Sequence, residues 1–199
     1  MTLTVILLAA GEASRMGQPK ALLEWRGQPL LRYQVDQLLQ LDPVKLIVVL
    51  GHEAERLAPL LRDVDGRVWV GVNPDYRKGK STSVRFGARQ APQEADAVLV
   101  IGVDQPRPAA LLARLVESHA QKGAMLSIPT YRGKRGHPAV YSASLLPELL
   151  AVSEERQGLR EVTERHRREV NEAPVDSPLA LVDINTPEDY QAALRLQEP

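Results

Sequence analysis

The sequence predicts an α/β protein, a Rossmann-like three-layer α/β/α sandwich around a mostly parallel sheet. Short apolar stretches typical of strands alternate along the chain with stretches of helical apolar spacing. Several of the strand-like stretches are almost wholly apolar, as expected for strands covered on both faces. The sequence contains no internal repeat and no long linker, so residues 1–199 are expected to form a single domain.

The first half of the chain follows this alternation closely. Residues 5–8 are apolar, too few for a helix, and lead into small residues, which predicts a buried strand. Residues 78–83 are expected to form a turn before the third helix. The remaining elements expected here are helices over 29–41, 53–62 and 84–91 and strands over 44–50 and 68–72.

The second half continues the pattern with shorter elements. A strand over 97–103 should be central because it is almost wholly apolar, and it runs into Asp104. Thr186, Pro187 and Glu188 predict the start of a final helix, with a cap, a first-turn proline and an acid. The other expected elements are strands over 125–129, 138–142 and 179–182, a basic loop over 131–137 and helices over 108–121, 145–152 and 159–167.

Composition excludes several classes of function. The chain has 25 basic and 25 acidic residues, so no broad basic surface for nucleic acid is expected. Aromatic residues make up 4% of the chain, too few for a base-stacking platform, and there is no cysteine for disulfides or thiolate metal sites. No apolar stretch approaches the length of about 18 residues needed to span a membrane. The first residues show no signal-peptide pattern, so a cytoplasmic protein is expected.

The segment that follows the first strand predicts a polyphosphate site. Ala9, Ala10 and Gly11 are small enough for backbone N–H groups to approach a ligand, and Arg15 and Lys20 add two cations. The spacing matches neither a Walker A loop nor the dinucleotide-binding GxGxxG motif. A generic glycine turn with solvated cations is the alternative, but it would not predict this combination of residues.

Two aspartates follow predicted strands, at the edge where open α/β sheets bind ligands. Asp104 follows the strand expected to be central, and Asp183 follows the last one. Magnesium usually takes one or two carboxylates together with phosphate oxygens and water, so the pair suits a Mg²⁺–triphosphate site. The alternative is that each aspartate caps a following helix, although Thr186 is the nearer cap for the last one.

The whole chain resembles the MobA-like nucleotidyltransferases, and most of all the cytidylyltransferases that make molybdopterin cytosine dinucleotide. The resemblance implies the fold of the nucleotide-diphospho-sugar transferases. The family loop usually has serine where this chain has Ala13, which puts one hydroxyl contact in question. The motifs that carry the resemblance are LAAG and RMGQPK at 8–11 and 15–20, GH at 51–52, NP at 73–74, GKSTS at 79–83, VDQP at 103–106, GHP at 136–138 and VDINTPED at 182–189.

Carried over by position, the resemblance implies roles for individual residues. Arg15 would hold the outer phosphates, and Lys20 would stabilise charge at the α-phosphate. Asp104 would be the principal Mg²⁺ ligand and also catalytic, with Asp183 as its partner in the metal site. The nucleotide site would comprise Leu8, Ala9, Ala10, Gly11, Arg15, Lys20, Gly51, Asn73, Ser81, Thr82, Ser83 and Asp104, and the acceptor site Gly136, His137 and Pro138.

The expected activity is transfer of CMP from CTP to the phosphate of the molybdenum cofactor, with release of pyrophosphate. Ala10 and Pro19 favour CTP, because the guanylyltransferases of the same pathway usually differ at both positions. Guanylyl transfer or transfer to another phosphorylated acceptor is the first alternative. A non-catalytic accessory protein that carries the cofactor to a molybdoenzyme is the second, although Lys20 and the aspartate pair favour turnover.

Overall fold

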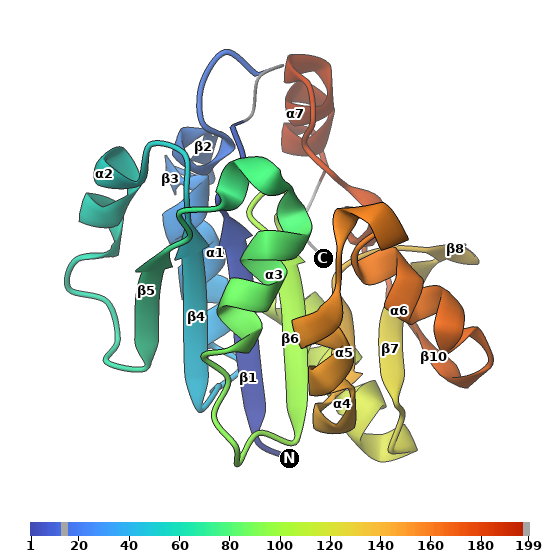
Figure 1. The fold of residues 1–199 in the computed structure, drawn as a ribbon. Helices are drawn as coiled ribbons and strands as arrows, with labels where there is room; N and C mark the ends of the chain where they lie inside the picture. The colour runs from blue at the N-terminus through green and yellow to red at the C-terminus, as the bar shows by residue number, and fades with distance from the viewer. Residues whose placement is uncertain (13–15, 197–199) are drawn as a thin grey trace.

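The computed structural model describes residues 1–12 and 16–196, and they fold around one large sheet (Figure 1). The order of strands across it is β10-β7-β9-β6-β1-β4-β5, with β8 paired to β7. Neighbouring strands are parallel except where β9 pairs with β6 and β7 and where β8 pairs with β7. The strands are β1 (Leu3–Ala9), β4 (Lys45–Leu50), β5 (Val68–Val72), β6 (Ala97–Gly102), β7 (Leu126–Tyr131), β8 (Lys134–Arg135), β9 (Ala139–Ser142) and β10 (Val170–Pro174).

Helices cover both faces of this sheet and complete the three layers that the sequence predicts (Figure 1). Seven α-helices lie in the described part of the chain, beside a small antiparallel pair, β2 (Glu24–Trp25) and β3 (Gln28–Pro29). The helices are α1 (Leu30–Leu39), α2 (Ala54–Leu57), α3 (Lys80–Ala88), α4 (Ala109–Lys122), α5 (Leu146–Ala151), α6 (Leu159–Arg165) and α7 (Pro187–Leu194). None of these helices, within residues 1–12 and 16–196, is both long and apolar enough to cross a membrane.

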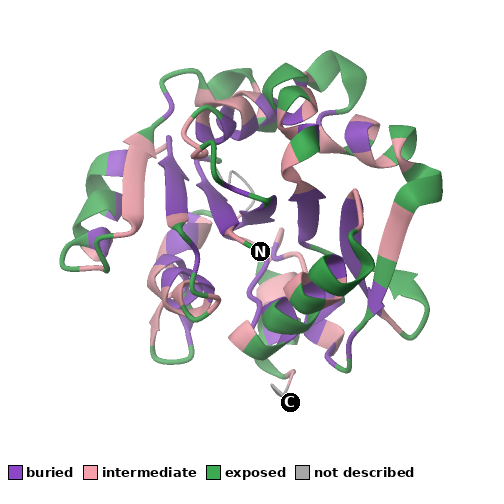
Figure 2. Cartoon of the chain, turned by 90° about the horizontal axis from the view of Figure 1, so that it is seen from below, coloured by how far each residue is buried: buried purple, intermediate pink, exposed green. Residues whose placement is uncertain are grey.

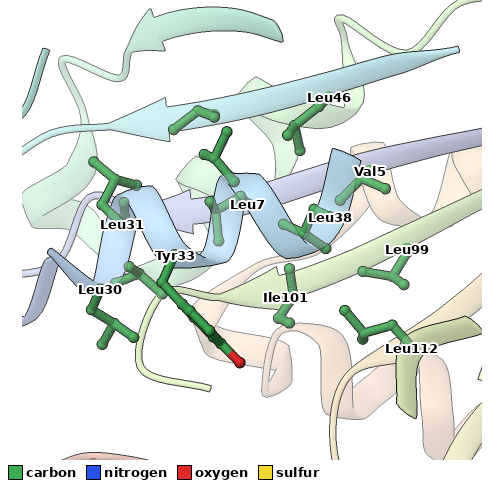
Figure 3. Close-up of a cluster of buried hydrophobic side chains, with 14 of the residues drawn as sticks. Val5, Leu7, Leu30, Leu31, Tyr33, Leu38, Leu46, Leu99, Ile101 and Leu112 are labelled. Atoms are coloured by element: carbon green, nitrogen blue, oxygen red, sulfur yellow. The ribbon is translucent and has the colours of Figure 1, made fainter. Parts of the chain in front are cut away.

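The core lies on both sides of β1, whose residues are all buried. Val5 and Leu7 face one hydrophobic cluster, which contains the apolar residues of α1 and α4 (Figure 3). Ile6 and Leu8 face the other cluster, under α3, α5 and α6. Figure 2 shows the same arrangement, with buried strands inside and exposed helical surfaces outside. Alternate side chains of a strand point to opposite faces, so an uninterrupted apolar run is what a doubly covered strand requires.

Two sequence-based expectations about local structure are wrong, and one strand is missing from the predicted elements. The stretch 179–182 is not a strand, because it lies in a short 3₁₀ helix, η7 (Pro178–Leu181), after a proline that suits the first turn of a helix. The strand missing from the prediction is β10 at the edge of the sheet, whose sequence VNEAP mixes polar and apolar residues and shows no strand pattern. The turn expected over 78–83 is shorter, because α3 already begins at Lys80 and includes the serines.

A buried guanidinium holds together the loops at one edge of the sheet. Arg107 is 0% exposed and donates hydrogen bonds to the carbonyl oxygens of His137 at 2.9 Å and Val182 at 2.8 Å. It also donates to those of Pro106 and Ala180, each at 3.2 Å. Burial lowers the pKa of Arg107 to about 10, while the nearby acids act in the opposite direction, so the side chain stays charged at neutral pH. One side chain therefore fixes three segments that are distant in sequence.

Replacing this guanidinium should destabilise the fold. Arg107→Met removes the donors from carbonyls that remain buried, and we expect the free energy of unfolding to fall by about 3 kcal/mol. Arg114→Met is the matched control, because Arg114 is 61% exposed and pairs with an exposed acid, so its removal should have little effect. Denaturant unfolding of both variants measures the difference. Equal stability of the two variants would contradict the role given to Arg107.

Candidate functional site

Two cavities lie at the edge of the sheet where the parallel strands end, with volumes of about 560 and 580 Å³. Each has the size of a small-molecule site. The residues that line both cavities are Leu8, Lys80, Gly102, Asp104 and Asn185. Two ligands bound side by side would therefore meet at Asp104. This is the arrangement that a transfer reaction between two substrates needs.

The first cavity is built on the loop that the sequence singled out. Leu8, Ala9, Ala10 and Gly11 line it, and Lys20 lies on the same wall. Backbone hydrogen bonds hold the strand ends together: the N–H of His52 donates to the carbonyl of Ala10 at 3.1 Å. Arg15, predicted to hold the outer phosphates, lies outside the described residues.

The lysine of this loop reaches across the cavity to the end of β6. Lys20 Nζ lies 3.0 Å from Asp104 Oδ2 and donates to Asn185 Oδ1 at 2.9 Å. The side chains of Lys20 and Asp104 are 16% and 25% exposed, so both remain accessible from the cavity. The contact brings together two residues that the sequence analysis assigned to one site.

Asn185 belongs to the site although the sequence analysis gave it no role. Its side chain accepts from Lys20, and its backbone N–H donates to Asp189 Oδ2 at 3.0 Å. Asp189 and Thr186 form a capping box at the start of α7, as the predicted helix start implied. The start of α7 thus fixes the position of Asn185 against Lys20. The signal in the sequence was its place inside the VDINTPED motif.

The carboxylate of Asp104 lies close to the backbone at the end of β6. A Cβ built on Gly102 would lie 2.3 Å from Asp104 Oδ1, so a residue with a side chain could not stand there without moving the carboxylate. The backbone carbonyl of Asp104 also accepts from the N–H of Ile184 at 2.9 Å. This bond brings the segment that carries Asp183 alongside the end of β6.

Asp183 lies in the site, but the segment that precedes it differs from the prediction. It follows η7 rather than a strand, yet it lines the second cavity together with Asp104. Its Oδ1 accepts from Gln105 Nε2 at 2.9 Å, and its Oδ2 lies 3.9 Å from His137 Nε2. Partial burial lowers the pKa of His137, and the Asp183 carboxylate acts in the opposite direction.

The other residues predicted for the nucleotide site do not all lie in one cavity. Ser83 lines the first cavity and Ser81 the second. Asn73 is buried and donates to the hydroxyls of Thr82 and Ser83, both at 2.9 Å, so it fixes the first turn of α3. Gly51 packs behind Ala10, where an added Cβ would lie 2.8 Å from the Ala10 Cβ. Neither Gly51, Asn73 nor Thr82 is among the residues that line the cavities.

The loop predicted for the acceptor lies at the second cavity. Gly136 and His137 line it, while Pro138 is buried next to them at the start of β9. The N–H of His137 donates to the carbonyl of Ala180 at 2.9 Å, and its carbonyl accepts a hydrogen bond from Arg107. The sequence analysis did not identify Arg107, since a single arginine after a proline gives no sign of burial.

This geometry suits chemistry on phosphates. Lys20 contacts Asp104 where the cavities meet, and Asp183 lines the second cavity together with Asp104. Two carboxylates can hold a divalent ion against phosphate oxygens. Among residues 1–12 and 16–196, no group of three or more acidic, histidine or cysteine side chains forms a metal site by itself. A metal held by two carboxylates would complete its coordination with water or with oxygens of the substrate.

Comparison with known proteins gives relatives with several activities. A molybdenum cofactor cytidylyltransferase from Escherichia coli is 30% identical over 94% of this chain and 93% of its own length. A nicotine blue oxidoreductase from Paenarthrobacter nicotinovorans is 32% identical over 79% of each chain. The bifunctional protein GlmU from Heliobacterium modesticaldum is 34% identical over 64% of this chain, but the match covers 28% of that longer protein.

Solved structures and a family model agree on the fold and the family of this chain. Rv0371c from Mycobacterium tuberculosis superposes with a TM-score of 0.83 at 25% identity over 97% of both chains. Its manganese complex shows the same fold, with a TM-score of 0.78 at 24% identity over 98% of both chains. A nucleotidyl transferase from Methanothermobacter thermautotroptrophicus gives a TM-score of 0.80 at 26% identity over 96% of this chain and 95% of its own. The model of the MobA-like NTP transferase domain matches residues 5–170, and the chain belongs to that family of nucleotidyltransferases.

Proposed function

We propose that this protein transfers CMP from CTP to the terminal phosphate of the molybdenum cofactor and releases pyrophosphate. The observation that carries the proposal is the contact between Lys20 and Asp104, placed where the two cavities meet. Similarity to the E. coli cytidylyltransferase over nearly the whole chain supports the choice of nucleotide and acceptor. In this proposal the first cavity takes CTP and the second takes the acceptor.

The residues of the first cavity suit a triphosphate. The backbone of Ala9, Ala10 and Gly11 would lie against the nucleotide, and Ser83 would contact its base or ribose. Lys20 would place a positive charge at the α-phosphate, where negative charge builds up as the acceptor oxygen attacks and pyrophosphate leaves. A phosphate acceptor is already anionic at neutral pH, so the reaction needs no strong general base.

The two carboxylates suit a magnesium ion. Asp104 and Asp183 line the same cavity, and hard oxygen ligands of this kind are those that Mg²⁺ prefers. Bound there with the nucleotide, the ion would neutralise charge on the phosphate oxygens and align them. The manganese complex of Rv0371c shows that a protein of this fold can be obtained with a divalent ion. Lys20 pairs with Asp104 and balances part of the negative charge of the carboxylates.

A second candidate function is redox chemistry, because one relative of similar coverage is named an oxidoreductase. Such a function would require a nicotinamide or similar cofactor in the first cavity. The pairing of Lys20 with an aspartate at the end of β6 suits phosphate transfer better, since a hydride transfer has no need of two acids beside a cation.

An assay with purified molybdenum cofactor tests the proposed reaction. The protein is mixed with Mg²⁺, the cofactor and each nucleoside triphosphate in turn, and pyrophosphate is measured. Release that depends on CTP and on the acceptor is expected. Preference for GTP would assign the guanylyl reaction instead, and tight binding without pyrophosphate would indicate a carrier. Consumption of reduced nicotinamide without pyrophosphate would favour the oxidoreductase.

Removing the lysine should separate binding from turnover. Lys20→Met keeps the length of the side chain without its charge, and we expect kcat to fall by about 100-fold with a smaller change in the affinity for CTP. Lys122→Met, at the exposed end of α4, is the matched control and should retain full activity. Steady-state kinetics and calorimetric binding supply the two quantities. A Lys20→Met enzyme of normal kcat would exclude the role given to Lys20.

Removing either carboxylate should weaken metal dependence. Asp104→Asn and Asp183→Asn each take one negative charge from the site, and we expect the Mg²⁺ concentration for half-maximal activity to rise by about tenfold or more. Asp176→Asn is the control, because the Asp176 side chain is 87% exposed and lies outside both cavities. Metal titrations at fixed CTP make the comparison. An unchanged requirement in both variants would place the ion elsewhere.

A further inference from the structure

A carboxylate of the protein fills the position where the start of α3 would bind an anion. Glu154 Oε1 accepts a hydrogen bond from the backbone N–H of Ser81 at 2.5 Å. The first N–H groups of a helix have no partner within the helix and carry partial positive charge, which favours a negative group there. Glu154 comes from the short connection between α5 and α6, and both it and Ser81 line the second cavity.

The turn before α3 is shaped to receive this acid. Gly79 has φ of +112°, and a Cβ there would lie 2.3 Å from Glu154 Cγ and 2.6 Å from its Oε1. A residue with a side chain would therefore push the carboxylate away from the helix. Lys80 follows directly and lines both cavities, so a cation stands next to the same turn.

The hydroxyl of Ser81 is buried without a hydrogen-bond partner among the described residues, which indicates a place for a ligand atom. Ser81 is 2% exposed, and its Oγ finds no hydrogen-bond partner in the part of the chain that the structure describes. A buried hydroxyl without a partner is unfavourable, and a ligand that accepted its hydrogen bond would remove this cost. Gly158 covers it, since a Cβ on that residue would lie 3.0 Å from the hydroxyl oxygen.

We propose that the first turn of α3 is a phosphate subsite, which Glu154 occupies until a phosphomonoester entering the second cavity displaces it. The ligand would accept hydrogen bonds from the N–H and hydroxyl of Ser81 and lie near the ammonium of Lys80. Glu154 and Gly158 belong to one connection, so one outward movement of it removes the acid and uncovers the hydroxyl. Assignment of this phosphate to the acceptor rests on the proposed function, whereas the subsite itself does not.

Binding of inorganic phosphate to the intact protein tests the subsite. The amide signal of Ser81 in ¹H–¹⁵N spectra is followed as phosphate is added to the wild type and to Glu154→Gln. The glutamine retains an oxygen that can accept from Ser81 but lacks the competing charge, so phosphate should bind about fivefold more tightly. Glu155→Gln changes an exposed neighbouring acid and should match the wild type, while Ser81→Ala should bind more weakly.

Two results would overturn the subsite. One is a Ser81 amide that does not respond to phosphate, and the other is a Glu154→Gln protein that binds phosphate no better than the wild type. Thermal unfolding of each variant confirms that it is folded, and Glu154→Asp, whose shorter side chain withdraws the acid, provides a second variant that should also bind more tightly.

Repeating the titration with saturating CTP and Mg²⁺ identifies the source of the phosphate. A response that persists places the subsite on the acceptor side, as we propose. A response that CTP abolishes would show that the turn binds a phosphate of the nucleotide and would overturn that assignment. Neither measurement depends on turnover, so failure of the cytidylyl transfer assay would leave the subsite itself untouched.

Discussion

The hydrogen bonds of the buried Arg107 are the interaction on which the edge of the sheet depends. Its guanidinium binds carbonyl oxygens of the loop at 137 and of the segment 180–182, and it follows Asp104 by three positions. Burying a charge is unfavourable, as the lowered pKa of Arg107 shows, and several hydrogen bonds to fixed dipoles compensate for it. Together with the backbone bonds from His137 to Ala180 and from Ile184 to Asp104, this arrangement joins three segments that are distant in sequence.

These segments position the residues that line the two cavities. Asp104 lies between the cavities, Asp183 and His137 lie on the second one, and Lys20 reaches in from the loop after β1. Parallel strands alone bring the loop after β1 and the end of β6 to the same edge. They do not bring Asp183 there, because it follows a 3₁₀ helix outside the sheet. Its placement depends on Arg107 and on the bond from Ile184 to the Asp104 carbonyl.

The sequence predicts the central strands and identifies the loop that lines the first cavity, because both have local causes. Apolar runs determine β1, β4 and β6, and small residues followed by a cation determine the loop that contains Lys20. It does not predict β10. The five residues of this strand mix polar and apolar side chains without a strand pattern, and they are identified as a strand by their backbone pairing with β7. The sequence also does not predict the contacts of Asn73 with the hydroxyls of α3, the burial of Arg107 or the contact of Glu154 with Ser81, because these depend on residues that are far apart or show no pattern.

The central claim is that one lysine and one aspartate mark the point of reaction between two neighbouring substrates. A crystal structure with Mg²⁺ and a non-hydrolysable CTP analogue tests it most directly. The claim predicts the triphosphate in the first cavity, Lys20 Nζ within hydrogen-bond distance of an α-phosphate oxygen, and the ion on Asp104. A nucleotide bound away from Lys20, or an ion without contact to Asp104, would contradict it.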